Sequence, residues 1–166
     1  NWKRPKKEIN FLFSLLEKFL SNKIQNLIEK NIKLKFVGEL NKLPNKLKTL
    51  IKKSELKTSK NSSLQVNIAL NYGSKSELIN SIKTVIKKKI EINEKNINNN
   101  LFTKNIVDPD ILIRTGNTKR LSNFMLWQLS YSEIFFVQKL WPDFEINDFK
   151  KVLNKFKLIK RNFGSI

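Results

Sequence analysis

Cysteine and histidine are both absent from the 166 residues of this chain. Their absence excludes disulfides, thiolate nucleophiles, imidazole general bases and the usual zinc sites. Any catalysis must therefore use carboxylates, hydroxyls, amides, cationic groups or a metal ion held by oxygen atoms. The length is that of one domain, and we expect residues 1–166 to form a single one.

Long apolar runs are also missing, since none approaches the roughly 20 residues needed to cross a bilayer. Nothing resembles a signal peptide followed by a small-residue cleavage site. These patterns favour the cytosol or an equivalent compartment. Because the chain begins at Asn1 without a methionine, we expect it to be trimmed or to be a fragment.

Arginine is scarce in a chain whose formal charge is +19, because only four of its 33 cationic residues are arginines. Lysine, asparagine and isoleucine are enriched together throughout the chain, which favours codon bias over a selected surface for polyanions. Where lysine is the default cation, a retained arginine indicates a site that needs a planar, bidentate donor for phosphate or carboxylate. The four are Arg4, Arg114, Arg120 and Arg161.

Apolar periodicity predicts helices that alternate with strands. The expected helices span 5–30, 44–56, 74–90 with a Ser76 cap, and 147–164 with a Gly164 C-cap; the expected strands span 32–38, 64–73 and 108–116. The asparagine-rich segment 91–100 reads as a loop, with a short helix from about Asn96 as the alternative. This order predicts an α/β fold with a mostly parallel central sheet flanked by helices.

Polar residues gather where the last predicted strand ends, in "ILIRTGNTKRLSN". In a parallel sheet, ligands bind outside the carboxyl ends of the strands. The forks of Arg114 and Arg120, the hydroxyls of Thr115 and Ser122, and the loop amides could enclose a diphosphate. A surface loop with two salt-bridged arginines is the alternative interpretation.

Glu133 is a lone acid inside the apolar run "NFMLWQLSYSEIFF". A partly buried carboxylate needs a partner, which could be a metal ion or simply a nearby lysine. The aromatic residues of this run read as buried, which argues against a nucleic-acid-binding module with exposed aromatics. They are Phe124, Trp127, Phe135 and Phe136.

The segment "PDILIRTGNTKRLSNFMLWQLSYSEIFF", followed by "LWPDF", resembles the signature of the cis-prenyltransferases, and specifically of the undecaprenyl diphosphate synthases. Two further segments agree in the same order, namely "NWKRPKKE" and "NIALNYG". The resemblance covers nearly the whole chain. It implies the cis-prenyltransferase fold and a head-to-tail condensation of isopentenyl diphosphate onto an allylic diphosphate, with farnesyl diphosphate as the expected allylic substrate.

The resemblance also implies roles for residues near the predicted strand end. Arg114, Arg120 and Ser122 match residues that hold the diphosphate of isopentenyl diphosphate. Glu133 matches an acid linked to Mg²⁺ and to the same substrate. Mg²⁺ is thus the implied cofactor, and no histidine is required.

The start of the chain matches the allylic side of the family's active site. Trp2 and Arg4 correspond to residues on that side, with Arg4 near the allylic diphosphate, and Asn1 and Glu8 correspond to positions tied to activity. The equivalent first helix lines a hydrophobic tunnel, so part of the 11–20 face could contact lipid. Ordinary packing would produce the same apolar stripe.

Several departures from the family pattern accompany the matches. The family's N-terminal phosphate loop with its magnesium-binding aspartate is absent from the sequence given, so we expect this chain alone to be inactive. Substitutions in the motifs could weaken phosphate binding, although Arg161 could compensate for the last of them. They are Ser74 and Lys75, Asn117 and Thr118, and Asn162.

The implied product is a long-chain polyprenyl diphosphate lipid carrier for glycan assembly. The resemblance implies a homodimer in the cytosol, with peripheral contact with the membrane and no nucleic-acid partner. A non-catalytic partner subunit of the same family is the alternative, although such a subunit would have little need of Arg114, Arg120, Ser122 and Glu133.

Overall fold

The structure is a computed structural model that describes residues 3–162. The chain divides into two units, Asn1–Tyr72 and Gly73–Ile166, and each is described by itself. That the two units form one cis-prenyltransferase domain stays a prediction.

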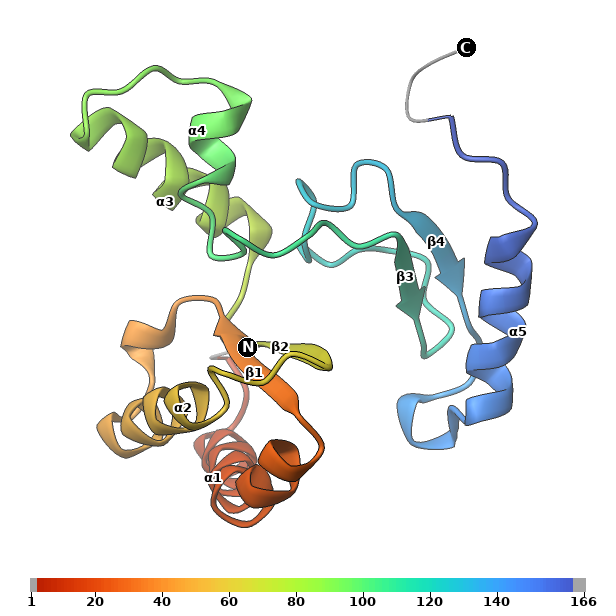
Figure 1. The fold of residues 1–166 in the computed structure, drawn as a ribbon, viewed down its shortest axis with the longest axis horizontal. Coiled ribbons are helices and arrows are strands. Elements are labelled where there is room, and N and C mark those ends of the chain that lie inside the picture. Colours follow the sequence, from red (N-terminus) through yellow and green to blue (C-terminus); the bar gives the residue numbers. More distant parts are fainter. Residues whose placement is uncertain (1–2, 163–166) are drawn as a thin grey trace. The chain divides into compact units, whose positions relative to one another are not determined.

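The first unit contains two helices and a pair of parallel strands. In chain order it consists of α1 (Lys6–Glu29), β1 (Ile32–Val37), a 3-10 turn (Leu40–Lys42), α2 (Asn45–Lys57) and β2 (Leu64–Ala69). β1 and β2 are parallel, with Ile32 opposite Leu64 and Val37 opposite Ala69. Both helices pack against β1 and against each other (Figure 1).

Apolar residues at helical and strand spacing form the core of this unit. Leu34 and Phe36 lie on one face of β1, and Leu47 and Ile51 lie one turn apart on α2; all four are buried. Each such side chain contributes about 1.5–3 kcal/mol through burial. Thr58, just after α2, accepts a hydrogen bond from the backbone N–H of Leu34 at 3.1 Å, which fixes the helix to the strand.

The second unit contains α3 (Ser74–Lys87), α4 (Glu94–Asn98), β3 (Ile111–Arg114), β4 (Glu133–Phe136), a 3-10 turn (Trp141–Asp143) and α5 (Ile146–Lys157). β3 and β4 form a second parallel pair in which Ile111 is opposite Glu133 and Arg114 is opposite Phe136. α5 runs beside β4, and α3 packs against α4 (Figure 1).

The predicted α/β architecture with parallel strands and flanking helices is confirmed, and so is the short helix, which begins at Glu94. β4 was not predicted, because its residues sit inside a continuous apolar run. The predicted cap Ser76 is wrong, since its hydroxyl donates back to the carbonyl of Gly73 at 2.9 Å. α5 ends at Lys157, before the predicted terminus, and Gly164 lies outside the described residues.

The prediction that the aromatic run is buried is wrong for two of its members. Phe124 is 36% exposed and Phe136 is 41% exposed, while Trp127 and Phe135 are half-buried. In β4 the side chains alternate between the two faces, and Ile134 and Phe136 lie on the more exposed one. Within residues 3–162, no helix combines the length and apolar character needed to cross a membrane.

Candidate functional site

The segment that follows β3, residues 114–123, is called the arginine loop below. β3 ends at Arg114, and the chain turns through Gly116 and Asn117, whose φ angles are 87° and 53°. The N–H of Gly116 donates to the carbonyl of Lys139 at 2.8 Å, and that of Asn117 donates to the carbonyl of Val137 at 3.3 Å. The loop therefore begins at the carboxyl end of the β3–β4 pair, where a parallel sheet places its ligands.

Arg114 is held by hydroxyl groups of its own loop. Its Nε donates to Thr118 Oγ1 at 3.1 Å, and one terminal nitrogen donates to Ser122 Oγ at 3.4 Å. Among the residues that the structure describes, no carboxylate lies within ion-pair distance of Arg114. Since hydroxyls are neutral, the guanidinium is oriented while its charge stays uncompensated. Such a group is suited to an anion that accepts several hydrogen bonds.

Two departures from the family pattern fit this geometry. Asparagine tolerates the left-handed conformation better than most residues, so Asn117 can occupy this turn. Thr118 gives Arg114 a neutral acceptor. Thr118 therefore helps to orient Arg114. The sequence alone did not indicate this role, because Thr118 departs from the family pattern.

Ser122 forms a hydrogen bond with Arg114, whereas Arg120 does not contact it through any hydrogen bond found among the described residues. Ser122 contacts Arg114 directly and has a left-handed φ of 51°. Arg120 lies in the same loop and is exposed. Of the predicted diphosphate ligands, the structure thus joins Arg114 and Ser122 by a hydrogen bond and leaves Arg120 at the surface beside them.

Glu133 does not join this group. It begins β4 opposite Ile111, whereas Arg114 lies three residues further along β3, which is about 10 Å at the usual rise of a strand. The parallel register therefore puts Glu133 at the amino end of the pair and Arg114 at its carboxyl end. The cationic partner of Glu133 is Arg161, at 3.9 Å, and not a lysine.

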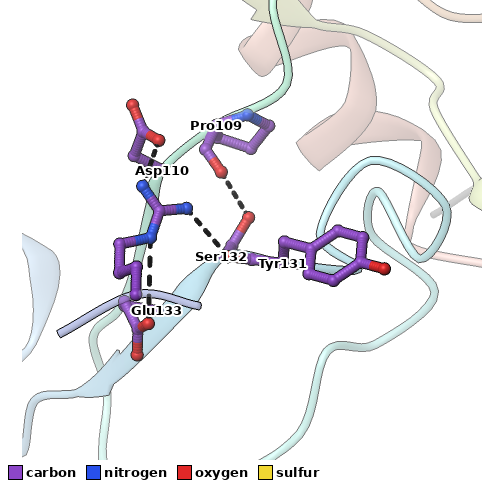
Figure 2. Close-up of polar contacts among 6 residues, drawn as sticks. Pro109, Asp110, Tyr131, Ser132 and Glu133 are labelled. Carbon is purple, nitrogen blue, oxygen red and sulfur yellow. Dashed lines mark hydrogen bonds and ion pairs between the residues drawn. The ribbon is translucent and has the colours of Figure 1, made fainter. Parts of the chain in front are cut away.

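Arg161 forms ion pairs with Asp110 and Glu133 at this amino end, and both acids are labelled in Figure 2. Its terminal nitrogens donate to Asp110 Oδ1 and, at 3.0 Å, to the carbonyl of Tyr131, and its guanidinium lies 5.5 Å from the ring centroid of Phe156. Only 17% of its side chain is exposed. Arg161 is thus engaged within its own unit. To compensate for Asn162 in a phosphate contact, Arg161 would have to leave these partners.

A cavity of about 640 Å³ lies next to Arg161, and its lining includes Asp108, Asp110 and Trp127. Burial, and next the negative charge of Glu94, raise the pKa of Asp108 above its ordinary value. Because most of its charged lining is acidic, this cavity is unsuited to a diphosphate.

Mg²⁺ usually binds proteins through one or two carboxylates and completes its shell with water and substrate phosphates. Glu133, with 32% of its side chain exposed, can supply one such carboxylate. Within residues 3–162, no three acidic side chains lie close enough together to bind one metal ion. The described residues therefore fit a site in which Mg²⁺ takes one protein carboxylate and completes its shell with water and substrate phosphates.

The first unit places Arg4 at an apolar cavity. Asn1 and Trp2 lie outside the described residues, whereas Arg4 forms an exposed ion pair with Glu8. Arg4 also lines a cavity of about 370 Å³ together with apolar side chains. These are Ile9, Leu12, Phe13, Leu43 and Leu70. A cation beside an apolar hollow matches the two parts of a prenyl diphosphate.

Helix α1 carries apolar residues on two sides. One set packs into the core and includes Phe13, Leu16 and the fully buried Leu20. The other set is exposed and consists of Phe11, Leu12, Leu15 and Phe19. Packing therefore explains only some of the apolar residues of α1. The exposed ones lie in the 11–20 segment, for which the sequence predicts a contact with lipid.

The chain is similar to known prenyltransferases. A family model described as "Putative undecaprenyl diphosphate synthase" matches residues 1–164. An isoprenyl transferase of Prochlorococcus marinus is 44% identical across the whole chain, which covers 64% of that protein. An isoprenyl transferase of Campylobacter jejuni is 42% identical over 99% of the chain, which covers 73% of that protein. The chain thus spans about two thirds of the length of these curated relatives.

Two solved structures share the fold. The crystal structure of a probable undecaprenyl diphosphate synthase from Campylobacter jejuni superposes with a TM-score of 0.92 at 42% identity, covering 99% of this chain and 78% of that one. Lavandulyl diphosphate synthase from Lavandula x intermedia, in complex with dimethylallyl diphosphate, gives 0.92 at 30% identity, covering 99% and 75%. Because the family model matches nearly the full length of the chain, the chain belongs to the undecaprenyl diphosphate synthase family of prenyltransferases.

Proposed function

We propose that the protein containing this chain is a cis-prenyltransferase that condenses isopentenyl diphosphate onto an allylic diphosphate. The observation that carries the proposal is the state of Arg114. Its guanidinium is oriented by two hydroxyls at the carboxyl end of a parallel strand pair, and within the described residues no carboxylate neutralises it. An oriented, uncompensated guanidinium is what binding of a substrate diphosphate needs.

The arginine loop would hold isopentenyl diphosphate. Arg114 supplies the fixed fork, Ser122 a hydroxyl next to it, and Arg120 a second fork from the exposed part of the loop. Together they would fix the diphosphate and so restrict the positions open to the double bond at the other end of the substrate. This positioning lowers the barrier by replacing a random encounter with a set geometry.

The cavity at Arg4 would hold the allylic substrate. Arg4 would bind the diphosphate, and the apolar lining would contact the hydrocarbon tail. Arg4 must first leave Glu8, but both side chains are about half exposed, and such ion pairs contribute little to stability. The exposed side of α1 would then receive the growing chain.

In the reaction, the allylic C–O bond breaks and the diphosphate departs with its electron pair. The double bond of isopentenyl diphosphate forms the new C–C bond to that carbon, and loss of a proton sets the new cis double bond. Glu133 would give Mg²⁺ one carboxylate after leaving Arg161, and the ion would supply stabilisation of negative charge on a diphosphate. The chain's own cationic groups would stabilise the negative charge that builds on the departing group.

We further propose farnesyl diphosphate as the allylic substrate and a long polyprenyl diphosphate as the product. A Wigglesworthia glossinidia brevipalpis relative, 42% identical across this chain, is named as specific for (2E,6E)-farnesyl diphosphate. A homodimer and a location in the cytosol with peripheral contact at the membrane are parts of the same proposal.

The test is isopentenyl transfer by the full-length gene product with farnesyl diphosphate and Mg²⁺, comparing wild type, Arg114→Ala and Lys119→Ala. Lys119 is the matched control, because it is an exposed cation of the same loop. A charge-assisted hydrogen-bonding group contributes about 1.5–3 kcal/mol, so kcat/KM should fall by about tenfold to a hundredfold in Arg114→Ala. Lys119→Ala should stay within about threefold of wild type.

A folded wild-type protein that incorporates no isopentenyl diphosphate would overturn the proposal. That result would favour the alternative of a non-catalytic partner subunit. Equal losses in Arg114→Ala and Lys119→Ala would show that the loop acts by general charge, against a specific role for Arg114.

A further inference from the structure

Helix α3 begins without a cap from its own sequence. Its N-cap position is Gly73, which has no side chain, and the hydroxyl of Ser76 is turned back to the carbonyl of Gly73. The first N–H groups of a helix have no partner within it and need one from elsewhere.

Asn123, some fifty residues later in the chain, supplies those partners. Its backbone carbonyl accepts from the N–H of Ser74 at 2.9 Å, and its side-chain Oδ1 accepts from the N–H of Lys75 at 2.9 Å. In return, Ser74 Oγ accepts from the N–H of Leu126 at 3.0 Å, and Ser74 is completely buried. α3 is therefore joined to the last residue of the arginine loop by two hydrogen bonds and to Leu126, just beyond the loop, by a third.

Gly73 makes room for this contact. A Cβ at Gly73 would lie 2.9 Å from Nδ2 of Asn123, closer than side chains pack. Its φ of −153° is open to any residue, so the space for Asn123, and not the backbone conformation, is what favours glycine here.

The joined segment is conformationally strained. Ser122, Asn123 and Met125 have left-handed φ angles of 51°, 62° and 46°. Each such residue other than glycine costs about 1–2 kcal/mol, and the conformation persists only where neighbouring contacts enforce it. The N–H of Phe124 closes the turn locally by donating to the carbonyl of Leu121 at 3.0 Å, and the bonds from Asn123 to α3 hold the closed turn against the helix. Ser122 is the residue of this turn whose hydroxyl meets Arg114.

We propose that Asn123 is a positioning residue for the substrate diphosphate. By capping α3 it fixes the left-handed turn that places Ser122 against Arg114, and so sets the affinity of the loop for isopentenyl diphosphate. Asn123 acts through Ser122 and does not itself touch the substrate. This inference rests on the proposed function, because it assumes that Arg114 and Ser122 bind that diphosphate.

The test compares four forms of the full-length gene product: wild type, Asn123→Ala, Gly73→Ala and Asn105→Ala. Gly73→Ala displaces the Asn123 side chain without altering it. Asn105 is the matched control, because it is an exposed asparagine with the same φ of 62° and lies outside the loop. The measurements are calorimetric binding of isopentenyl diphosphate alone, KM and kcat for the same substrate, and the melting temperature.

We expect Asn123→Ala and Gly73→Ala to weaken binding of isopentenyl diphosphate by about fivefold, the usual effect of losing one capping contact. KM should rise by the same factor while kcat changes less than about twofold. Asn105→Ala loses the same tolerance of a left-handed φ but no cap of α3, so it should lower the melting temperature less than Asn123→Ala and leave binding and KM unchanged.

Failure of the inference can be told apart from failure of the proposed function. If wild type neither binds nor incorporates isopentenyl diphosphate, the proposed function fails and the inference fails with it. If wild type is active and the Asn123 and Gly73 variants lose only melting temperature, the contact is structural and the inference alone is overturned. Equal weakening in Asn105→Ala would overturn it as well. Should Asn123→Ala not fold, Gly73→Ala decides between these outcomes.

Discussion

Glu77 is a buried acid of α3, and we predict that its carboxylate is essential to the stability of the second unit. It is 1% exposed and accepts hydrogen bonds from the backbone N–H groups of Phe102 and Thr103, at 2.9 and 3.3 Å. Its second oxygen accepts from Nε2 of Gln128 at 3.0 Å. It thereby ties α3 to the segment after α4 and to the one after the arginine loop.

Glu77→Ala would remove the acceptor from the N–H groups of Phe102 and Thr103, while Nε2 of Gln128 would keep Thr103 Oγ1 at 2.8 Å. Each unsatisfied buried donor costs about 1–3 kcal/mol, so the free energy of unfolding should fall by at least about 2 kcal/mol. Glu77→Gln should cost less. Oε1 of Gln128 is buried without a partner among the described residues, so rotation of the Gln128 amide can offer it to a new amide N–H. We expect a loss of about 1–2 kcal/mol for that variant.

Urea unfolding of the full-length gene product, followed by circular dichroism and tryptophan fluorescence, measures these losses. Glu29→Ala is the matched control, because Glu29 is an exposed helical glutamate, and it should stay within about 0.5 kcal/mol of wild type. A loss below about 1 kcal/mol in Glu77→Ala, or equal losses in the alanine and glutamine variants, would refute the reasoning.

Two further predictions concern the strand and helix ends. Asn117→Ala should lower the free energy of unfolding by about 1 kcal/mol, because alanine has the β-carbon that a φ of 53° disfavours but lacks the polar group by which asparagine offsets the strain. Asn117→Gly should be close to neutral, and equal melting temperatures for the two variants would contradict this. The hydrogen bond from Lys139, and then that from the N–H of Glu145, hold the pKa of Asp148 below its ordinary value of 3.8. Its stabilising contribution is therefore present above pH 3.8 and lost as the pH falls through the folded-state pKa. Asp148→Asn should be less stable than wild type in urea at pH 7 and should match it in strong acid, and a gap independent of pH would refute the assignment.

Elements with local sequence signals could be predicted. The helical spacing of apolar residues in α1, α2 and α3, and the alternation in β1, depend on nearby residues alone. β4 could not be recognised in this way. Its residues "EIFF" continue an apolar run that holds no glycine or proline to signal the turn before them, and only pairing with β3 shows that they are extended. The same pairing separates Glu133 from Arg114, which no spacing along the sequence indicates.

The cap of α3 shows why local rules fail at the site. Ser76 satisfies the usual preference for a hydroxyl near a helix start, yet Asn123 accepts the bonds. A partner some fifty residues away can be chosen only by tertiary structure. Asn123 is next to Ser122, so the contact with α3 also constrains the position of Ser122. A helix is more rigid than a loop and therefore fixes the loop's geometry more precisely than contacts within the loop would.

The scarcity of arginine can now be interpreted in physical terms. Arg4 pairs with Glu8, and Arg161 is occupied by Asp110 and Glu133, so each has an acid within the chain. A rigid fork suits these sites, but their charge is already balanced. Arg114 differs, because its described partners are hydroxyls, which orient the guanidinium without reducing its charge. If retention of arginine alone indicated phosphate, all four would be equal candidates. Arg120 likewise has no acid within ion-pair distance among the described residues. The type of partner therefore separates the two loop arginines from Arg4 and Arg161, and of the two only Arg114 is held in a fixed orientation by hydroxyls.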